Sequence, residues 1–147
     1  MTTTDQPTAT ASILLVEDHD DTARVLSRLL NLSGYHVHTA GTYAGALEIC
    51  GKTHFDLLIS DVGLPDGSGY DLMREIHARR CAAKGIAVSG YGSEQDVEQS
   101  LRAGFAEHLV KPVAFETLCE AIRRLIPGDA TYTNSPNLTR ASGGDMA

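Results

Sequence analysis

The chain has 147 residues, of which 42% are hydrophobic and 21% are charged, and its formal net charge is -7. This length and composition predict one soluble globular domain, without room for a second catalytic or DNA-binding domain. The acidic balance speaks against a nucleic-acid binder, because nucleic-acid backbones are bound by clustered Lys and Arg. Three widely spaced cysteines indicate neither a disulfide framework nor a zinc site. The sequence shows no signal-peptide pattern and no apolar run of about 18 residues, so we expect a cytoplasmic protein without a membrane span.

Short apolar runs alternate with helix-like segments along the chain. Residues 1–11 and 127–147 have almost no apolar periodicity, and we expect both to be disordered tails. Between them, five apolar runs predict strands, and the apolar spacing after each run predicts a helix. The predicted strands are at residues 13–16, 37–40, 57–60, 86–88 and 109–110.

Sequence signals also mark where helices begin and end. The S-x-x-D pattern of Ser68 with Asp71, and of Ser93 with Asp96, predicts a capping box at the start of two helices. Glycines are expected just beyond helix ends, because they adopt the left-handed conformation without strain. The glycines at such places are Gly34, Gly51, Gly85 and Gly104.

The strict alternation of strands and helices predicts an α/β fold, in which a doubly wound five-stranded parallel sheet carries helices on both faces. In such sheets, ligands bind beyond the carboxyl ends of the strands. The polar residues at these ends are therefore candidates for a functional site. They are Glu17, Asp18, Asp61, Ser89 and Lys111.

These residue types suit phosphoryl transfer. Three carboxylates at one edge of a sheet repel one another unless a cation neutralises them. Mg²⁺ suits a site of one or two carboxylates, water molecules and a phosphoryl oxygen. A lysine and a hydroxyl on the same edge supply positive charge and a hydrogen-bond donor to the oxygens of a transferring phosphoryl group. The sequence therefore predicts phosphoryl transfer to a carboxylate.

Four segments carry a family resemblance: LLVEDHD, LLISDVGLPDGSGYDLM, AVSGYG and AGFAEHLVKPV. In this order and at these separations they resemble the successive motifs of response-regulator receiver domains, especially those of hybrid sensor histidine kinases or single-domain regulators. The resemblance covers residues 12–126. It implies a flavodoxin-like sheet with the strand order 2-1-3-4-5, and a place in a two-component phosphorelay.

The resemblance also implies roles for individual residues. Asp61 would be the phosphoacceptor and would form an aspartyl phosphate, while Ser89 and Lys111 would contact the phosphoryl oxygens. The bond between Lys111 and Pro112 would be cis. The phosphoryl donor would be a histidine kinase or a histidine phosphotransfer domain, and an unknown downstream protein would read the surface of the fourth helix, fifth strand and fifth helix.

The implied metal site uses the acids around Asp61. Asp18 would bind Mg²⁺ directly, Glu17 would act nearby or through water, and Asp61 and the backbone carbonyl of Gly63 would complete the protein ligands. Glu17 stands where the family frequently has Asp. Because Glu17 keeps the negative charge and has a longer reach, we expect metal binding to survive this difference.

One position departs from the family pattern. Receiver domains often carry Tyr or Phe three residues before the lysine, and this aromatic ring rotates inward on activation; here the residue is His108. This chain therefore lacks, at this position, the Tyr or Phe ring that makes the switch in the family. His108 is either a partly exposed histidine with satisfied hydrogen bonds or a pH-sensitive element.

Two other functions fit parts of the sequence. Asp18 and Asp20 lie in a pattern that resembles the D-x-D-x-T signature of haloacid-dehalogenase-type phosphatases, but this interpretation leaves Asp61 without a purpose. In the simpler interpretation, Asp20 or Asp21 caps the helix after the first strand. A binding-only pseudo-receiver is the third hypothesis. We expect a receiver domain that is not an enzyme, because dephosphorylating itself is not enzymatic turnover.

Overall fold

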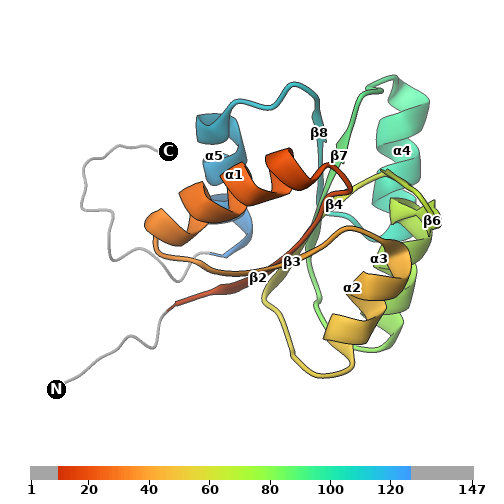
Figure 1. The fold of residues 1–147 in the computed structure, drawn as a ribbon. Coiled ribbons are helices and arrows are strands. Elements are labelled where there is room, and N and C mark those ends of the chain that lie inside the picture. Colours follow the sequence, from red (N-terminus) through yellow and green to blue (C-terminus); the bar gives the residue numbers. More distant parts are fainter. Residues whose placement is uncertain (1–9, 127–147) are drawn as a thin grey trace, which may run out of the picture.

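The computed structural model describes residues 10–126, in which strands and helices alternate (Figure 1). Residues 1–9 and 127–147, which make up most of the two predicted tails, lie outside the described residues. The main sheet contains β2 (Ser12–Val16), β3 (His36–Ala40), β4 (Leu57–Asp61), β7 (Gly85–Ser89) and β8 (Glu107–Val110). The helices are α1 (Asp20–Leu32), α2 (Tyr43–Cys50), α3 (Gly69–Ala78), α4 (Glu94–Ala103) and α5 (Phe115–Leu125).

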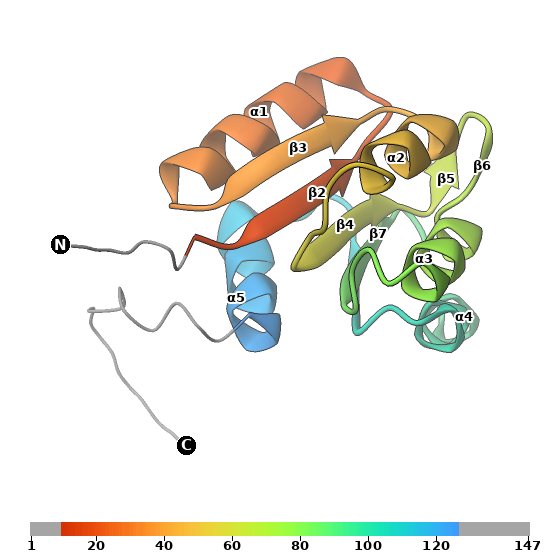
Figure 2. The ribbon, with the colours of Figure 1, turned by 90° about the horizontal axis from the view of Figure 1, so that it is seen from below.

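The strands lie in the order β3-β2-β4-β7-β8, and every neighbouring pair is parallel. Counted along the chain this order is 2-1-3-4-5, which confirms the predicted doubly wound sheet. Helices α1 and α5 cover one face, and α2, α3 and α4 cover the other (Figures 1 and 2). The order changes direction at β2, so the carboxyl ends of β2 and β4 border the crevice in which such sheets bind ligands.

The three inner strands are buried on both faces, which explains why they are continuous apolar runs. In β4, Leu58 packs in the cluster formed with α2, α3 and α4, whereas Ile59 packs in the cluster formed with α1 and α5. Both side chains are almost completely buried. Within residues 10–126, no helix combines the length and the apolar character that crossing a membrane requires.

The two predicted capping boxes differ in the structure. At the start of α4, the Ser93 hydroxyl accepts from the Asp96 backbone N–H and the Asp96 carboxylate accepts from the Ser93 N–H, so this capping box is complete. At the start of α3, Ser68 accepts from the Asp71 N–H at 3.1 Å, but the Asp71 carboxylate pairs with Arg74 at 2.9 Å instead. The second prediction is therefore only half right, because an arginine one turn away competes for the carboxylate.

Two further predictions of helix ends were wrong. The N-cap of α1 is His19, without a side-chain capping bond, and Asp20 and Asp21 lie in the first turn. There, their charges stabilise the positive end of the helix dipole rather than cap the helix. Gly85 begins β7 rather than ending a helix. A Cβ atom at this position would lie 2.5 Å from the Met73 sulfur, so close packing requires glycine.

A short hairpin, β5 (Gly63–Leu64) with β6 (Gly67–Ser68), follows the third strand of the sheet and was not predicted. Asp66 lies between its strands and accepts hydrogen bonds from the backbone N–H groups of Tyr43 at 2.7 Å and Ala44 at 3.0 Å. These bonds tie the hairpin to the first turn of α2. The chain segment that leaves the sheet next to Asp61 is therefore anchored.

Candidate functional site

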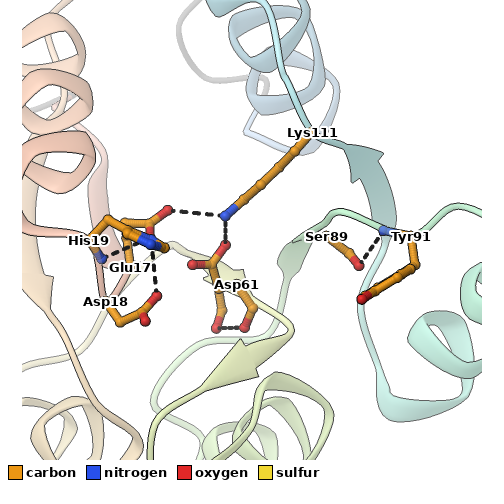
Figure 3. A network of polar contacts seen from close by, with 8 residues as sticks. Glu17, Asp18, His19, Asp61, Ser89, Tyr91 and Lys111 are labelled. Carbon is orange, nitrogen blue, oxygen red and sulfur yellow. Dashed lines mark hydrogen bonds and ion pairs between the residues drawn. The ribbon is translucent and has the colours of Figure 1, made fainter.

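Asp61 is the last residue of β4, and its side chain is buried between neighbouring strand ends, with 5% of the residue exposed. Lys111, directly after β8, places its Nζ atom 2.7 Å from the Asp61 Oδ1 atom and 3.5 Å from the Glu17 Oε1 atom (Figure 3). The lysine thus bridges two carboxylates, one at the last residue of β4 and one directly after β2. The buried Asp61 carboxylate, paired with the Lys111 ammonium group, lies at the carboxyl edge of the sheet, where the sequence predicts it.

The other acids come from the turn after β2. Glu17 is buried and Asp18 is more exposed, and the Nδ1 atom of His19 lies 3.1 Å from Glu17 Oε2 and 3.5 Å from Asp18 Oδ1. One possible ligand atom from each of these residues and from Asp61 lies within 4.8 Å of the others. In the part of the chain that the structure describes, this cluster has the donor set and spacing to hold a metal ion.

The site carries more negative charge than Lys111 balances. Burial and the neighbouring Glu17 carboxylate raise the pKa of Asp61 to about 7, although Lys111 acts in the opposite direction. Burial also acts to raise the pKa of Glu17, but bonds with Asp61 and His19 outweigh it and lower this pKa. The bond with Glu17, together with the charge of Asp18, raises the pKa of His19. An added divalent cation would relieve this excess of negative charge.

Ser89, the last residue of β7, lies at the same edge (Figure 3). Its backbone carbonyl accepts from the Lys111 N–H at 2.8 Å, and its Oγ atom accepts from the Tyr91 N–H at 2.9 Å. The hydroxyl is therefore positioned by the loop after β7. The structure brings Glu17, Asp61 and Lys111 into direct contact. Ser89 is linked to Lys111 through a hydrogen bond between their backbones.

The remaining predicted features lie close to Asp61. Gly63 is exposed in β5, two residues after Asp61. The bond between Lys111 and Pro112 is cis, as the resemblance implies. Asp20 is not part of the cluster of possible metal ligands in residues 10–126. This placement does not favour the phosphatase hypothesis, which needs Asp20 beside Asp18.

Two residues of this site were missed in the sequence. His19 stands inside the acidic run after β2, so its closeness in sequence to Glu17 and Asp18 was a usable signal. Tyr91 contributes only its backbone N–H and carbonyl groups, which no side-chain pattern reveals. His108 joins the same loop: its Nε2 atom lies 2.9 Å from the Tyr91 carbonyl oxygen, and its Nδ1 atom lies 2.6 Å from the Ser100 Oγ atom.

A cavity of about 750 Å³ opens beside Asp61. Its polar end contains Glu17, Asp61 and Lys111, and apolar side chains of the strands, of α1 and of α5 line the rest, among them Ile59, Val25 and Leu118. Asp61 is thus buried in the fold and at the same time lines this cavity.

Comparison with known proteins agrees with this geometry. Residues 13–123 match the family model of the response regulator receiver domain. The two-component response regulator ARR10 of Arabidopsis thaliana is 31% identical over 133 residues, which are 89% of this chain and 24% of that protein. The sensor histidine kinase RcsC of Escherichia coli K12 is 30% identical over 110 residues, which are 75% of this chain and 12% of that protein. The chain thus spans about a quarter or less of these relatives.

A solved structure shows the same fold. The CheY-like response regulator receiver domain protein from Methanospirillum hungatei JF-1 superimposes with a TM-score of 0.75 at 31% identity, over 83% of this chain and 98% of that chain. Together with the relatives, this likeness confirms the resemblance predicted from the four sequence motifs.

The expectation that the chain is not an enzyme was wrong as a categorical statement. The family match and the response-regulator relatives indicate a phosphoacceptor in signalling, and they give no ground for deciding catalytic activity in either direction. A phosphoacceptor carboxylate takes part in a covalent transfer reaction, so the absence of catalysis does not follow from membership in a signalling pathway.

Proposed function

The chain belongs to the response regulator receiver domain family, and on that premise we propose that residues 12–126 take a phosphoryl group onto Asp61 with the help of Mg²⁺. The proposed donor is the phosphohistidine of a histidine kinase or a histidine phosphotransfer domain in the cytoplasm. One observation carries the proposal: a buried Asp61 carboxylate lies 2.7 Å from the Lys111 ammonium group, beside further acids.

In the proposed reaction, an Asp61 carboxylate oxygen attacks the phosphorus atom of the phosphohistidine. A P–O bond to Asp61 forms while the P–N bond breaks, and its electron pair stays on the imidazole of the donor. Lys111, which already contacts the Asp61 oxygen, stabilises the negative charge on the transferring group. The Ser89 hydroxyl accepts from the Tyr91 N–H, so its own proton is available for a phosphoryl oxygen.

The residues present fit Mg²⁺. Glu17, Asp18 and Asp61 offer carboxylate oxygens from one compact cluster, and the backbone carbonyl of Gly63 is the further ligand that we propose. Carboxylate and carbonyl oxygens are the ligands that this hard cation prefers. When bound there, Mg²⁺ supplies positive charge to the phosphoryl oxygens and balances the acids.

Phosphorylation adds nearly two negative charges at Asp61. This charge attracts Lys111 and favours a donor bond from Ser89, so it biases the loops that follow β4 and β7. We propose that an unknown downstream protein reads the surface formed by α4, β8 and α5. This surface exposes apolar side chains, including Leu101 on α4 and Val110 on β8, as an interaction surface requires.

Intact-mass spectrometry after incubation with acetyl phosphate tests the proposal. We expect the wild type to gain one phosphoryl mass in the presence of Mg²⁺ and little without it. Asp61→Asn should gain none. Asp71→Asn is the matched control, because it makes the same chemical change at an exposed position of α3; it should be phosphorylated like the wild type.

A phosphoryl adduct on Asp61→Asn would contradict the assignment of the phosphoacceptor. If the folded wild type takes up no phosphoryl group and binds no beryllofluoride in the presence of Mg²⁺, the chain is a binding-only pseudo-receiver. Steady release of phosphate that requires Asp18 but not Asp61 would favour the phosphatase hypothesis.

A further inference from the structure

His108 lies in β8 and is held through both nitrogens of its ring. The Nδ1 atom lies 2.6 Å from the hydroxyl of Ser100 in α4, and the Nε2 atom lies 2.9 Å from the backbone carbonyl oxygen of Tyr91. Ser100 is completely buried. The ring therefore connects the core side of α4 with the loop that follows β7.

The partners determine where the ring proton lies. A carbonyl oxygen can only accept, so Nε2 carries the hydrogen that it donates to Tyr91. In the neutral ring, Nδ1 then accepts from the Ser100 hydroxyl. Both nitrogens are satisfied, and a rotation of the ring would leave the buried Ser100 hydroxyl without its partner, which is costly.

The same loop residue reaches the phosphoacceptor edge. The backbone N–H of Tyr91 donates to the Ser89 hydroxyl at 2.9 Å, while its carbonyl oxygen accepts from His108. A continuous series of hydrogen bonds thus runs from Ser89, beside Asp61, through the Tyr91 backbone and His108 to Ser100 of α4. The tyrosine side chain itself is exposed and takes no part in the series.

We propose that His108 is a positioning residue that ties the Ser89 loop to Ser100. Through the Tyr91 backbone, it couples the presence of a phosphoryl group on Asp61 to α4. The inference rests on the proposed function, since it assumes that a phosphoryl group reaches Asp61. In this arrangement the ring stays fixed, and the coupling runs through hydrogen bonds instead of the rotation of an aromatic side chain.

Beryllofluoride with Mg²⁺, as a stand-in for the phosphoryl group, provides the test. Its affinity and the backbone amide shifts of α4 are measured by ¹H–¹⁵N NMR for the wild type, His108→Phe, His108→Gln and Ser100→Ala. Phe keeps a planar ring without hydrogen-bonding atoms. Gln offers one donor and one acceptor at a separation similar to that of the two ring nitrogens, so it should restore both bonds.

In the wild type, we expect beryllofluoride to shift the amides around Ser100. His108→Phe should lose these α4 shifts and bind beryllofluoride about three- to tenfold more weakly, the effect of about one net hydrogen bond that positions Ser89. His108→Gln should recover the affinity and the shifts. Ser100→Ala keeps the bond to Tyr91, so it should lose the α4 shifts but retain the affinity within about twofold.

His77→Phe, on the exposed face of α3, is the matched control and should behave like the wild type. Unchanged α4 shifts in Ser100→Ala, or in a folded His108→Phe, would overturn the inference, while leaving the proposed function intact. If the wild type does not bind beryllofluoride, the proposed function fails and the inference fails with it. Because Ser100→Ala and His108→Gln alter little volume, the test does not depend on the folding of His108→Phe.

Discussion

The Asp61 carboxylate shows how a buried position changes one acid. Burial and the Glu17 carboxylate raise its pKa from 3.8 to about 7. Between these values the folded protein binds a proton that the unfolded chain does not bind. The contribution of this group to the free energy of unfolding is therefore fully present below about pH 4 and is lost as the pH rises through 7.

The first prediction follows from this loss of stability with rising pH. In protein treated with a chelator, Asp61→Asn should raise the free energy of unfolding at pH 8 by about 1–2 kcal/mol and have a smaller effect at pH 5, since a tenfold change in proton affinity corresponds to about 1.4 kcal/mol. Urea unfolding at both pH values measures it. Asp71→Asn should not show the difference.

Two groups beside Asp61, His19 and Glu17, also make the free energy of unfolding depend on pH, so the effect of Asp61 has to be measured by comparing variants. The pKa of His19 is raised above 6.5, so His19 also contributes stability that is lost as the pH rises in this window. The pKa of Glu17 is lowered below 4.5, so its contribution is lost only at more acidic pH. The change of the wild type's free energy of unfolding with pH therefore cannot be assigned to Asp61 alone. An equal gain in stability at pH 5 and pH 8 would contradict the prediction.

Gly69 carries the second prediction at the scale of a residue. Its N–H donates to the Val62 carbonyl at 2.6 Å, and a Cβ atom there would collide with the Asp61 carbonyl oxygen and lie 2.9 Å from the Val62 Cα atom. Because these neighbours are backbone, Gly69→Ala should cost about 2 kcal/mol and reduce phosphorylation of Asp61. Urea unfolding and intact-mass spectrometry measure the two effects.

Gly90→Ala is the control for this prediction. A Cβ atom at Gly90 would meet nothing within 4 Å, and the backbone there is not left-handed. This variant should change the free energy of unfolding by less than about 1 kcal/mol. If Gly69→Ala were as stable as the wild type, the close packing of the segment after β4 could not be what fixes the position of Asp61.

At the scale of elements, the start of α4 offers the third prediction. Ser93 and Asp96 satisfy each other's backbone N–H groups, whereas Ser68 at the start of α3 provides a single capping bond. Ser93→Ala should therefore cost about 1 kcal/mol or slightly more, and Ser68→Ala should cost less. Denaturant unfolding of the two variants measures the difference. Equal costs would mean that the reciprocal bond from Asp96 adds nothing.

The elements that were predictable from sequence are those with a strong burial pattern. The inner strands read as apolar runs because both of their faces are covered, and their ends fell within two residues of the prediction. The hairpin β5–β6 was not predictable, since its strands have two residues each and no apolar alternation. The capping pattern at Ser68 was ambiguous, because the sequence does not show whether Arg74 takes the Asp71 carboxylate.

At the scale of the molecule, the topology explains why the meeting of the candidate residues was predictable. Parallel strands bring residues that are far apart in sequence to one edge, so the strand pattern alone predicts that Glu17, Asp61 and Lys111 meet. The contacts that the sequence could not supply use backbone groups, as at Tyr91, or depend on a helix turning a side chain inward, as at Ser100. Such contacts require the packed structure.

The sheet also joins two hydrophobic cores, which leads to the last prediction. Leu58 and Ile59 are adjacent in β4 but pack in different cores, and both are almost completely buried. Leu58→Ala and Ile59→Ala should each lower the free energy of unfolding by about 2–5 kcal/mol. Neither helix layer has a core without the sheet, so the two layers should unfold together in one transition.

Hydrogen exchange distinguishes this shared unfolding from local loosening. In Ile59→Ala, the most protected amides of α1 and α5 and those of α2 and α3 should lose protection by the same factor, because each opens only when the sheet opens. Leu58→Ala should give the same pattern from the other face. If Ile59→Ala accelerated exchange in α1 and α5 alone, the layers would be separate cooperative units. The residues around Asp61 come from strands on both sides of β4, and they would then lack a single rigid support.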